Sequence, residues 1–319
     1  MSPRRALVIA FWPENAQGLG HGTRKPQHAY MGLIDFILNL AGVLLWLSWR
    51  SIRFDPLVKT RPATLIGTLR RAEPRRMKGW QLLAGLGVLL VLRAVVYRQI
   101  GPEADWTPKL DLFFVVLAFP SRPPPGHFLP AMLFSLLSFA RILIIGYFWL
   151  LALVVINRCN AEPDPLQKML RLHLGPVVRW PLLLQVLLPL VSITALWIAL
   201  HPLLVHLEIT DRVRSNAHLV EQGLLVGVSI YFTLQFLLPV FLLLHLFASY
   251  IYLGRSPLWD FVAATARNLL APLRWLPLQI ARLDFAPLGG VVLILFLLHW
   301  LPNLILARMA ENNVTPWPQ

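Results

Sequence analysis

Three polar side chains stand inside long apolar runs of the sequence, where they could bind a solute or join two helices. They are Arg141, Gln235 and His245. Such groups are candidate functional residues, because a charged or titratable side chain is costly in hydrocarbon. We expect Arg141 to extend toward the interface or to bond Gln185 or Gln235, with a substrate or anion contact as the alternative. For His245 we expect a hydrogen bond between helices, and ligation of a haem or metal is the alternative.

The sequence contains no recognisable catalytic motif. It has no Gly-rich phosphate loop, no His-Glu-x-x-His, no Gly-x-Ser-x-Gly and no cysteine pair, since Cys159 is the single cysteine. A coupled transporter needs a carboxylate near the middle of a span, whereas Asp35 lies four residues from the start of the first apolar run. Arg93 lies four residues before Tyr97, close enough to a span end to snorkel outward. We therefore predict no catalytic residue, no cofactor and no metal, and we disfavour a proton or sodium antiporter.

The composition is that of a membrane protein. Of the 319 residues, 57% are hydrophobic and 14% are charged, against about 25% charged in ordinary soluble domains. A bilayer core of about 30 Å requires roughly 20 mostly apolar helical residues, and six windows qualify. The predicted spans are 31–49, 80–97, 130–156, 181–205, 221–253 and 283–301. We predict an all-α polytopic membrane protein with about six transmembrane helices, paired in sequence order.

Two features modify these spans. Pro189 and Pro239 lie inside the fourth and fifth spans, where we expect kinks. Residues 112–119 are apolar but too few to cross, so we interpret them as interfacial or re-entrant.

The basic residues predict the orientation. The segments 50–79, 158–179 and 254–282 together hold 17 lysines and arginines, and the segments 98–129, 206–220 and 302–319 hold six. Because basic segments resist translocation, we place the first set in the cytoplasm and both termini outside. Cys159 then faces a reducing compartment and cannot form an internal disulfide. Residues 1–30 show no periodicity, so we predict either a disordered tail or a true start at Met31.

A tripeptide pattern recurs about every hundred residues, each time between two apolar runs. The three copies are Asp55-Pro56-Leu57, Asp164-Pro165-Leu166 and Ser256-Pro257-Leu258. Repeats of this size indicate tandem supersecondary units. We predict three repeats of helix, amphipathic segment and helix, in which Ser256 caps a surface helix that begins at Pro257 and ends before Pro272.

The cytoplasmic segments carry the charge that we expect to meet lipid or a partner. The predicted contact residues are Arg70, Arg71, Arg75, Arg76, Lys78, Arg267, Arg274 and Trp275. Each basic side chain near an anionic leaflet contributes about 1 kcal/mol to membrane binding. The alternative is that the cluster only enforces topology. We predict no nucleic-acid partner.

Two stretches resemble the YggT family of bacterial and plastid membrane proteins. Residues 45–49 (Leu-Trp-Leu-Ser-Trp) and the following Asp-Pro-Leu-Val at 55–58 are similar to a span end and Asn-Pro-Leu-Val in that family. Ser-Pro-Leu-Trp-Asp-Phe at 256–261, Leu-Leu-Ala-Pro-Leu-Arg-Trp at 269–275 and Leu-Asp-Phe-Ala-Pro-Leu at 283–288 resemble its remaining motifs more closely. The third repeat is the clearest and the second is weak. A third repeat, and the position of Gly289-Gly290 after this turn, depart from the family pattern.

The resemblance implies an integral protein of the bacterial inner membrane without established enzyme activity, in a family linked to assembly of membrane complexes, cell division and osmotic tolerance. The corresponding domains are a tail (1–30), a first repeat (31–97), an external connection (98–129), a second repeat (130–205), an external loop (206–220), a third repeat (221–301) and a C-terminal tail (302–319).

Three functions remain open. The leading prediction is a non-catalytic scaffold, assembly factor or subunit of a membrane complex, which binds anionic lipid and a membrane-protein partner or a second copy. The second is a channel or transporter for an ion or small osmolyte, lined by hydroxyl and amide side chains such as Ser192, Ser229 and Gln235. The third is a membrane enzyme that uses loop residues such as His201, His206 and Asp211.

Overall fold

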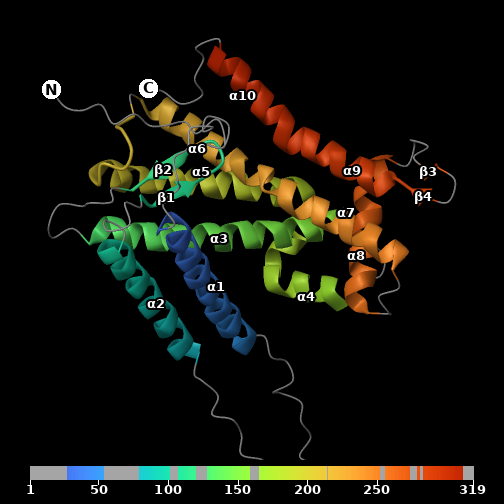
Figure 1. Ribbon diagram of the computed structural model, residues 1–319, viewed down its shortest axis with the longest axis horizontal. Coiled ribbons are helices and arrows are strands. Elements are labelled where there is room, and N and C mark those ends of the chain that lie inside the picture. Colours follow the sequence, from blue (N-terminus) through green and yellow to red (C-terminus); the bar gives the residue numbers. More distant parts are fainter. Residues whose placement is uncertain are drawn as a thin grey trace, which may run out of the picture. The chain divides into compact units, whose positions relative to one another are not determined.

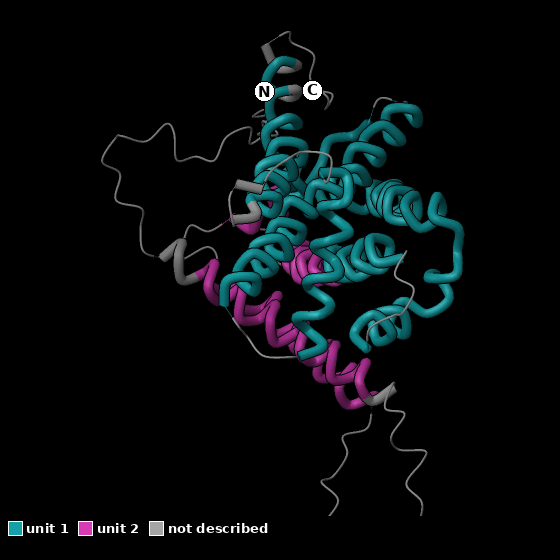
Figure 2. The backbone as a smooth tube through the Cα atoms, turned by 90° about the vertical axis from the view of Figure 1, so that its right-hand side faces the viewer, with its two compact units in different colours: residues 1–17, 111–117, 144–319 teal, residues 18–110, 118–143 magenta. Residues whose placement is uncertain are grey.

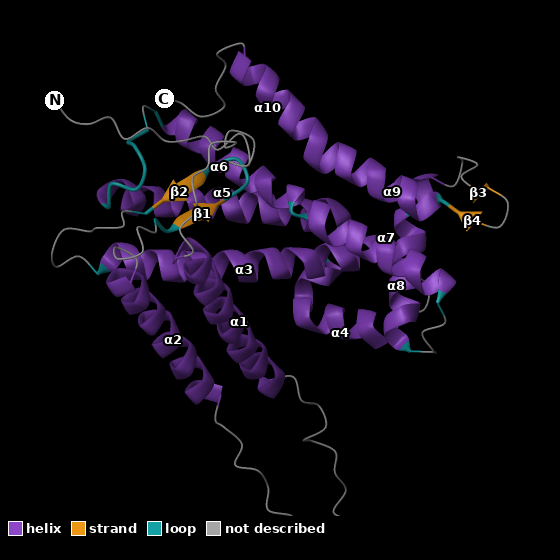
Figure 3. Cartoon of the chain, in the orientation of Figure 1, coloured by secondary structure: helices purple, strands orange, loops and turns teal. Residues whose placement is uncertain are grey.

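The chain folds as an α-helical, multi-pass membrane protein (Figures 1 and 3). The computed structural model describes residues 27–53, 79–100, 107–119, 128–158, 165–213, 215–251, 256–273, 279–280 and 283–311. Six helical segments within these residues are long and apolar enough to cross a membrane. The helices are α1 (Gln27–Arg53), α2 (Gly79–Ile100), α3 (Leu129–Ile156), α4 (Pro165–Leu174), α5 (Leu182–His206), α6 (Asn216–Phe232), α7 (Leu234–Tyr250), α8 (Pro257–Leu269), α9 (Ala286–Leu295) and α10 (Leu301–Glu311).

The remaining elements are short. They are the 3-10 turns η4 (Gly175–Arg179) and η5 (Ala271–Leu273), the π-turn η6 (Phe296–Trp300), and two hairpins of strands β1 (Lys109–Asp111) with β2 (Val116–Ala118) and β3 (Gln279–Ile280) with β4 (Leu283–Asp284). The apolar piece 112–119 thus includes the turn and second strand of the first hairpin. The side chain of Asp111 supports this turn by accepting a 2.9 Å hydrogen bond from the backbone N–H of Phe113.

The six predicted spans are confirmed, with changes at two of them. The fifth is interrupted at Thr233, where α6 ends and α7 begins, and both α5 and α7 continue through Pro189 and Pro239. The sixth begins at Ala286 instead of residue 283, because Leu283 pairs with Ile280 in the second hairpin. Pro287 follows directly, in the first turn where a missing N–H costs nothing. At the other end of the chain α1 begins four residues before Met31.

The chain divides into two compact units, coloured separately in Figure 2. Unit 2 comprises residues 18–110 and 118–143, hence α1, α2 and the first half of α3; unit 1 comprises residues 1–17, 111–117 and 144–319. In unit 2, α1 and α2 pack side by side (Figure 1). Their core consists of Leu86, Leu90 and Phe139, with Val43, Trp46 and Leu143 packed against it.

Unit 1 contains two extensive helix pairs, α5 with α6 and α7 with α9. The pairs α1–α2 and α7–α9 agree with the predicted pairing of spans in sequence order. The predicted pair of the third and fourth spans is wrong, since α5 packs most extensively against α6. Two glycines explain this partner: Gly223 and Gly227 let α6 approach Thr194 of α5, whose hydroxyl donates a 3.1 Å hydrogen bond to the Gly223 carbonyl.

Two of the three recurring tripeptides lie among the described residues, at least in part. Pro165 and Pro257 are the first residues of α4 and α8, as predicted for Pro257. Ser256 occupies the N-cap position of α8, but its side chain makes no capping hydrogen bond. The apolar face of α8 packs against protein: Phe261, Val262, Thr265 and Ala266 are buried, and Leu242, Ala266 and Leu270 form a core with neighbours from α9. Residues 54–78, which hold the first tripeptide, lie outside the described residues, as does Asp164.

Candidate functional site

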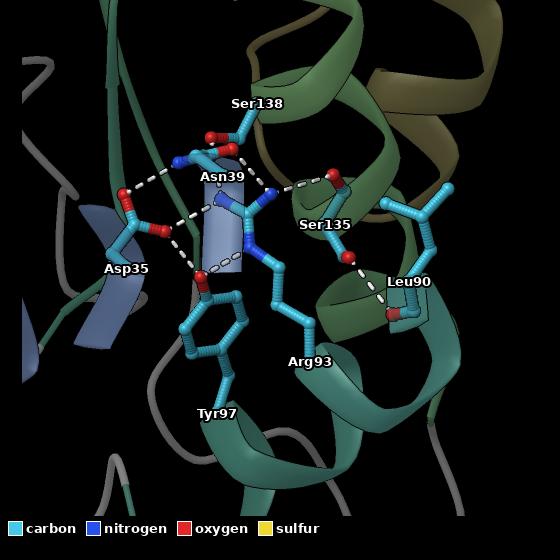
Figure 4. A network of polar contacts seen from close by, with 7 residues as sticks. All are labelled: Asp35, Asn39, Leu90, Arg93, Tyr97, Ser135 and Ser138. Atoms are coloured by element: carbon cyan, nitrogen blue, oxygen red, sulfur yellow. Dashed lines mark hydrogen bonds and ion pairs between the residues drawn. The ribbon is translucent and has the colours of Figure 1, made fainter. Parts of the chain in front are cut away.

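A charged cluster occupies the interior of unit 2, and Arg93 is its centre (Figure 4). Arg93 belongs to α2, Asp35 and Asn39 to α1, and Ser135 and Ser138 to the first half of α3. Arg93 is only 1% exposed and its guanidinium lies 2.5 Å from the Asp35 carboxylate. The prediction that Arg93 snorkels outward is therefore wrong, because acidic and polar partners on two other helices hold it inside the bundle.

The guanidinium of Arg93 meets one acceptor for each of its five N–H groups. Nη1 donates to the Asn39 side-chain oxygen at 2.7 Å and to the Ser135 carbonyl at 3.4 Å. Nη2 donates to Asp35 at 2.5 Å and to the Ser138 hydroxyl at 2.7 Å. Nε donates to the Tyr97 hydroxyl. Such saturation is the condition under which a buried cation is tolerated in an apolar interior.

The Asp35 carboxylate is held from three sides. One oxygen accepts from Arg93 and from the Tyr97 hydroxyl, and the other accepts a 3.1 Å hydrogen bond from the Asn39 amide. Asn39 therefore bridges the ion pair by accepting from the guanidinium and donating to the carboxylate. The Asp35 side chain is 28% exposed, so the cluster is closed at the guanidinium and partly open at the carboxylate.

Aromatic rings cover the cluster. The Arg93 guanidinium carbon lies 5.3 Å from the centre of the Tyr97 ring and 6.0 Å from that of Phe134. The Tyr97 and Phe134 rings meet edge to face at 5.2 Å, and Phe119 packs on Phe134 in the same manner. The negative ring faces favour the cation and exclude water from it.

The sequence held a signal for this cluster that our sequence reasoning missed. Asp35 lies four residues from the start of the first predicted span and Arg93 lies four residues from the end of the second. In an antiparallel hairpin these positions are at the same depth, so one acid and one base could have been paired. The Ser135 and Ser138 contacts left no comparable signal, because they depend on which face of α3 meets α2.

A second polar cluster joins three helices of unit 1. Asn157, at the end of α3, donates 2.8 Å to the Thr265 hydroxyl of α8, and Asn268 of α8 donates 2.9 Å to the Asn157 side-chain oxygen. Gln167 of α4 donates 2.6 Å to the Asn157 carbonyl. Asn157 and Thr265 are fully buried. This cluster fixes α4 and α8 against the end of a span, and the sequence analysis did not anticipate it.

The predicted intramembrane residues have separate surroundings. The buried Gln235 of α7 lies 3.0 Å from His299, which belongs to the π-turn η6. Gln185 donates to the carbonyls of Val177 and Val178. Both amides considered as partners for Arg141 are thus engaged elsewhere, and the half-buried Arg141 makes no hydrogen bond within the part of the chain that the structure describes. His245 is half-buried in α7.

Of the predicted lipid-contact residues, only Arg267 lies among the described residues. Arg267 is exposed on α8 and its Nε donates 3.3 Å to the Ala263 carbonyl. Arg70, Arg71, Arg75, Arg76, Lys78, Arg274, Trp275 and Cys159 lie outside the described residues. Among the residues that are described, no group of three or more histidine, cysteine, aspartate or glutamate side chains could hold a metal ion.

The fold and the cluster define a class: a multi-pass α-helical membrane protein with a saturated ion pair inside one helical unit. No family model, no curated protein and no solved structure matches the chain. The resemblance to the YggT family accordingly stays a prediction from the motifs.

Proposed function

We propose that this protein is a non-catalytic scaffold, an assembly factor or subunit of a membrane complex in a bacterial inner membrane. The observation that supports this proposal is the Arg93 cluster. Arg93 is the most deeply buried charged residue of the described spans, and acceptors on three helices of its own unit satisfy all its N–H groups. A buried charge that is fully paired within the fold is expected to have a structural role.

The other polar contacts between spans are consistent with this role. Trp149 donates 3.1 Å to Thr233, and Gln235 meets His299. Outward-facing residues of α1 are large and apolar, among them Leu33, Phe36 and Leu44. Surfaces of this kind contact lipid or the spans of a partner, and the basic connections bind the anionic leaflet in our proposal.

Purification from native membranes tests the proposal. A tagged chain, extracted in a mild detergent and separated by native electrophoresis, is expected to migrate with a stoichiometric membrane protein or as a homo-oligomer. Mass spectrometry then identifies the companion. Consistent recovery of a lone monomer, with the fold intact by circular dichroism, contradicts the scaffold function.

A channel or transporter is the second candidate, and two observations favour it. Asp35 is the partly open end of an intramembrane ion pair, and the contact between Gln235 and His299 lies at a π-turn, a helix irregularity common at functional sites. Proteoliposomes that contain the protein should then pass an ion or osmolyte faster than empty vesicles. The variant Asp35→Asn should reduce that flux, whereas flux equal to empty vesicles excludes this candidate.

A further inference from the structure

We propose that α4 and the following turn η4 form the surface that docks onto anionic lipid headgroups, and that α8 is an internal support. This inference rests on the proposed function, since it assigns the lipid contact to one segment. The sequence treats the two helices as equivalent, because each begins at the proline of a recurring tripeptide. Their surroundings in unit 1 differ.

The first argument is which face each helix buries. α8 turns its apolar face inward, where Phe261, Val262 and Ala266 are buried. Gln167, in contrast, is the single residue of α4 that is fully covered, at 1% exposed. Its hydrogen bond to the Asn157 carbonyl fixes the rotation of α4 about its axis.

The rotation of α4 about its axis determines which of its side chains are exposed. At 100° per residue, Met169 and Leu172 lie on the side of the helix away from Gln167. Both are more than half exposed, at 56% and 52%, and Lys168 beside them is exposed as well. Trp180, at the end of η4, is also exposed. Apolar side chains flanked by lysine and followed by tryptophan are the composition of an interfacial helix.

The second argument is position. α3 and α5 are both long enough to cross the membrane, and α4 and η4 connect the end of one with the start of the other. The segment is therefore held at a membrane face by its two neighbours in the sequence. Its exposed apolar side chains need to enter the boundary between headgroups and acyl chains by only about 5–10 Å.

The third argument is charge, which selects anionic lipid as the occupant. Residues 165–181 contain Lys168, Arg171 and Arg179 and no acidic residue, whereas α8 contains one acid and one base, Asp260 and Arg267. Glu162 and Asp164 precede α4 and lie outside the described residues. Lys168 and Arg179 are exposed, so their charges are free to meet phosphate.

A single fluorescent label tests this assignment. In a Cys159→Ser background, Leu172→Cys is labelled with an environment-sensitive fluorophore and the protein is placed in nanodiscs of phosphatidylcholine with increasing phosphatidylglycerol. We expect blue-shifted emission and quenching by headgroup-linked nitroxide lipid, both increasing with phosphatidylglycerol. The double variant Lys168→Gln/Arg179→Gln should weaken docking at a fixed phosphatidylglycerol fraction, lowering its equilibrium constant about fivefold for each charge removed.

Leu258→Cys on α8 is the matched control, because Leu258 is also 52% exposed. Its fluorescence should not depend on phosphatidylglycerol. The proposal is overturned if the label at position 172 stays in water, if its quenching ignores the anionic fraction, or if the charge variant behaves like the parent. A label shielded from water yet unquenched by lipid nitroxide indicates a second copy or another protein on this face and also overturns it.

The readout is independent of any companion protein. If the chain purifies alone but shows lipid-dependent quenching, the scaffold function is contradicted and the docking surface is supported. If it purifies with a companion but shows no lipid-dependent quenching, the scaffold function is supported and α4 is excluded as the lipid contact.

Discussion

At the scale of single residues, Arg93 shows how one cation can be made compatible with an apolar bundle. Each N–H of its guanidinium has an acceptor, and the acceptors come from α1, α2 and α3. The five donors of the guanidinium match these five acceptors, whereas a lysine ammonium has three donors and no planar geometry.

Arg93→Met should be strongly destabilising. It leaves the Asp35 carboxylate without its counter-ion inside the unit, and removing one member of a buried pair costs about 3–5 kcal/mol. Thermal unfolding in detergent, followed by size-exclusion chromatography, measures the loss. Arg98→Met, on the exposed last turn of the same helix, is the matched control and should change stability by less than about 0.5 kcal/mol.

The double variant Asp35→Leu/Arg93→Met separates charge from shape. Because both charges are removed together, it should recover much of the stability lost in Arg93→Met. A double variant as unstable as the sum of the two single variants would mean that the ion pair is not the source of the effect.

At the scale of elements, the sequence predicted the positions of the membrane spans but not which helices pack against each other. Span positions followed from composition because each span is apolar over about 20 residues. The partner of each span did not follow, because an apolar face has the same sequence pattern whether it is exposed, as on α1, or packed against protein, as on α8. The break at Thr233 was not predicted either, because the residue of this span that favours a kink is Pro239, and α7 continues through it.

Gly227 is a site of close approach between α6 and α5. A Cβ at this position would lie 2.8 Å from the Thr194 hydroxyl and 2.9 Å from the Leu190 carbonyl, and backbone cannot yield as a flexible side chain can. Gly227→Ala should therefore destabilise unit 1 by about 1–3 kcal/mol in thermal unfolding. Gly85→Ala in α2 meets nothing within 4 Å and should be neutral or stabilising. Equal effects of the two variants would contradict the packing of α5 on α6.

Thr265→Val tests the polar cluster that holds α8. The two side chains have nearly the same shape, but valine offers no acceptor to the Asn157 amide, which is buried. An unsatisfied buried donor costs about 1–3 kcal/mol, measurable as a lower unfolding temperature. Ser192→Ala removes a hydroxyl that bonds only carbonyls of its own helix and should have little effect. A neutral Thr265→Val would show that α8 does not depend on this contact.

At the scale of the whole molecule, the course of α6 and α7 determines on which side of the membrane each basic connection lies. The three segments rich in lysine and arginine join α1 to α2, α3 to α5, and α7 to α9. They share one side only if α6 and α7 together cross once. Each has 17 residues, or about 26 Å, and Thr233 alone stands between them. One residue is too short a connection to reverse a helix, so we predict a single tilted crossing.

That reasoning predicts the result of cysteine labelling. In a Cys159→Ser background, Arg70→Cys, Arg179→Cys and Arg267→Cys should react with a membrane-impermeant maleimide only after the cells are permeabilised. Arg212→Cys and Arg308→Cys should react in intact cells, because the connections that hold them carry few basic residues. If Arg70→Cys and Arg267→Cys react from opposite sides, α6 and α7 cross separately. The proposed common cytoplasmic face of the three basic connections is then wrong.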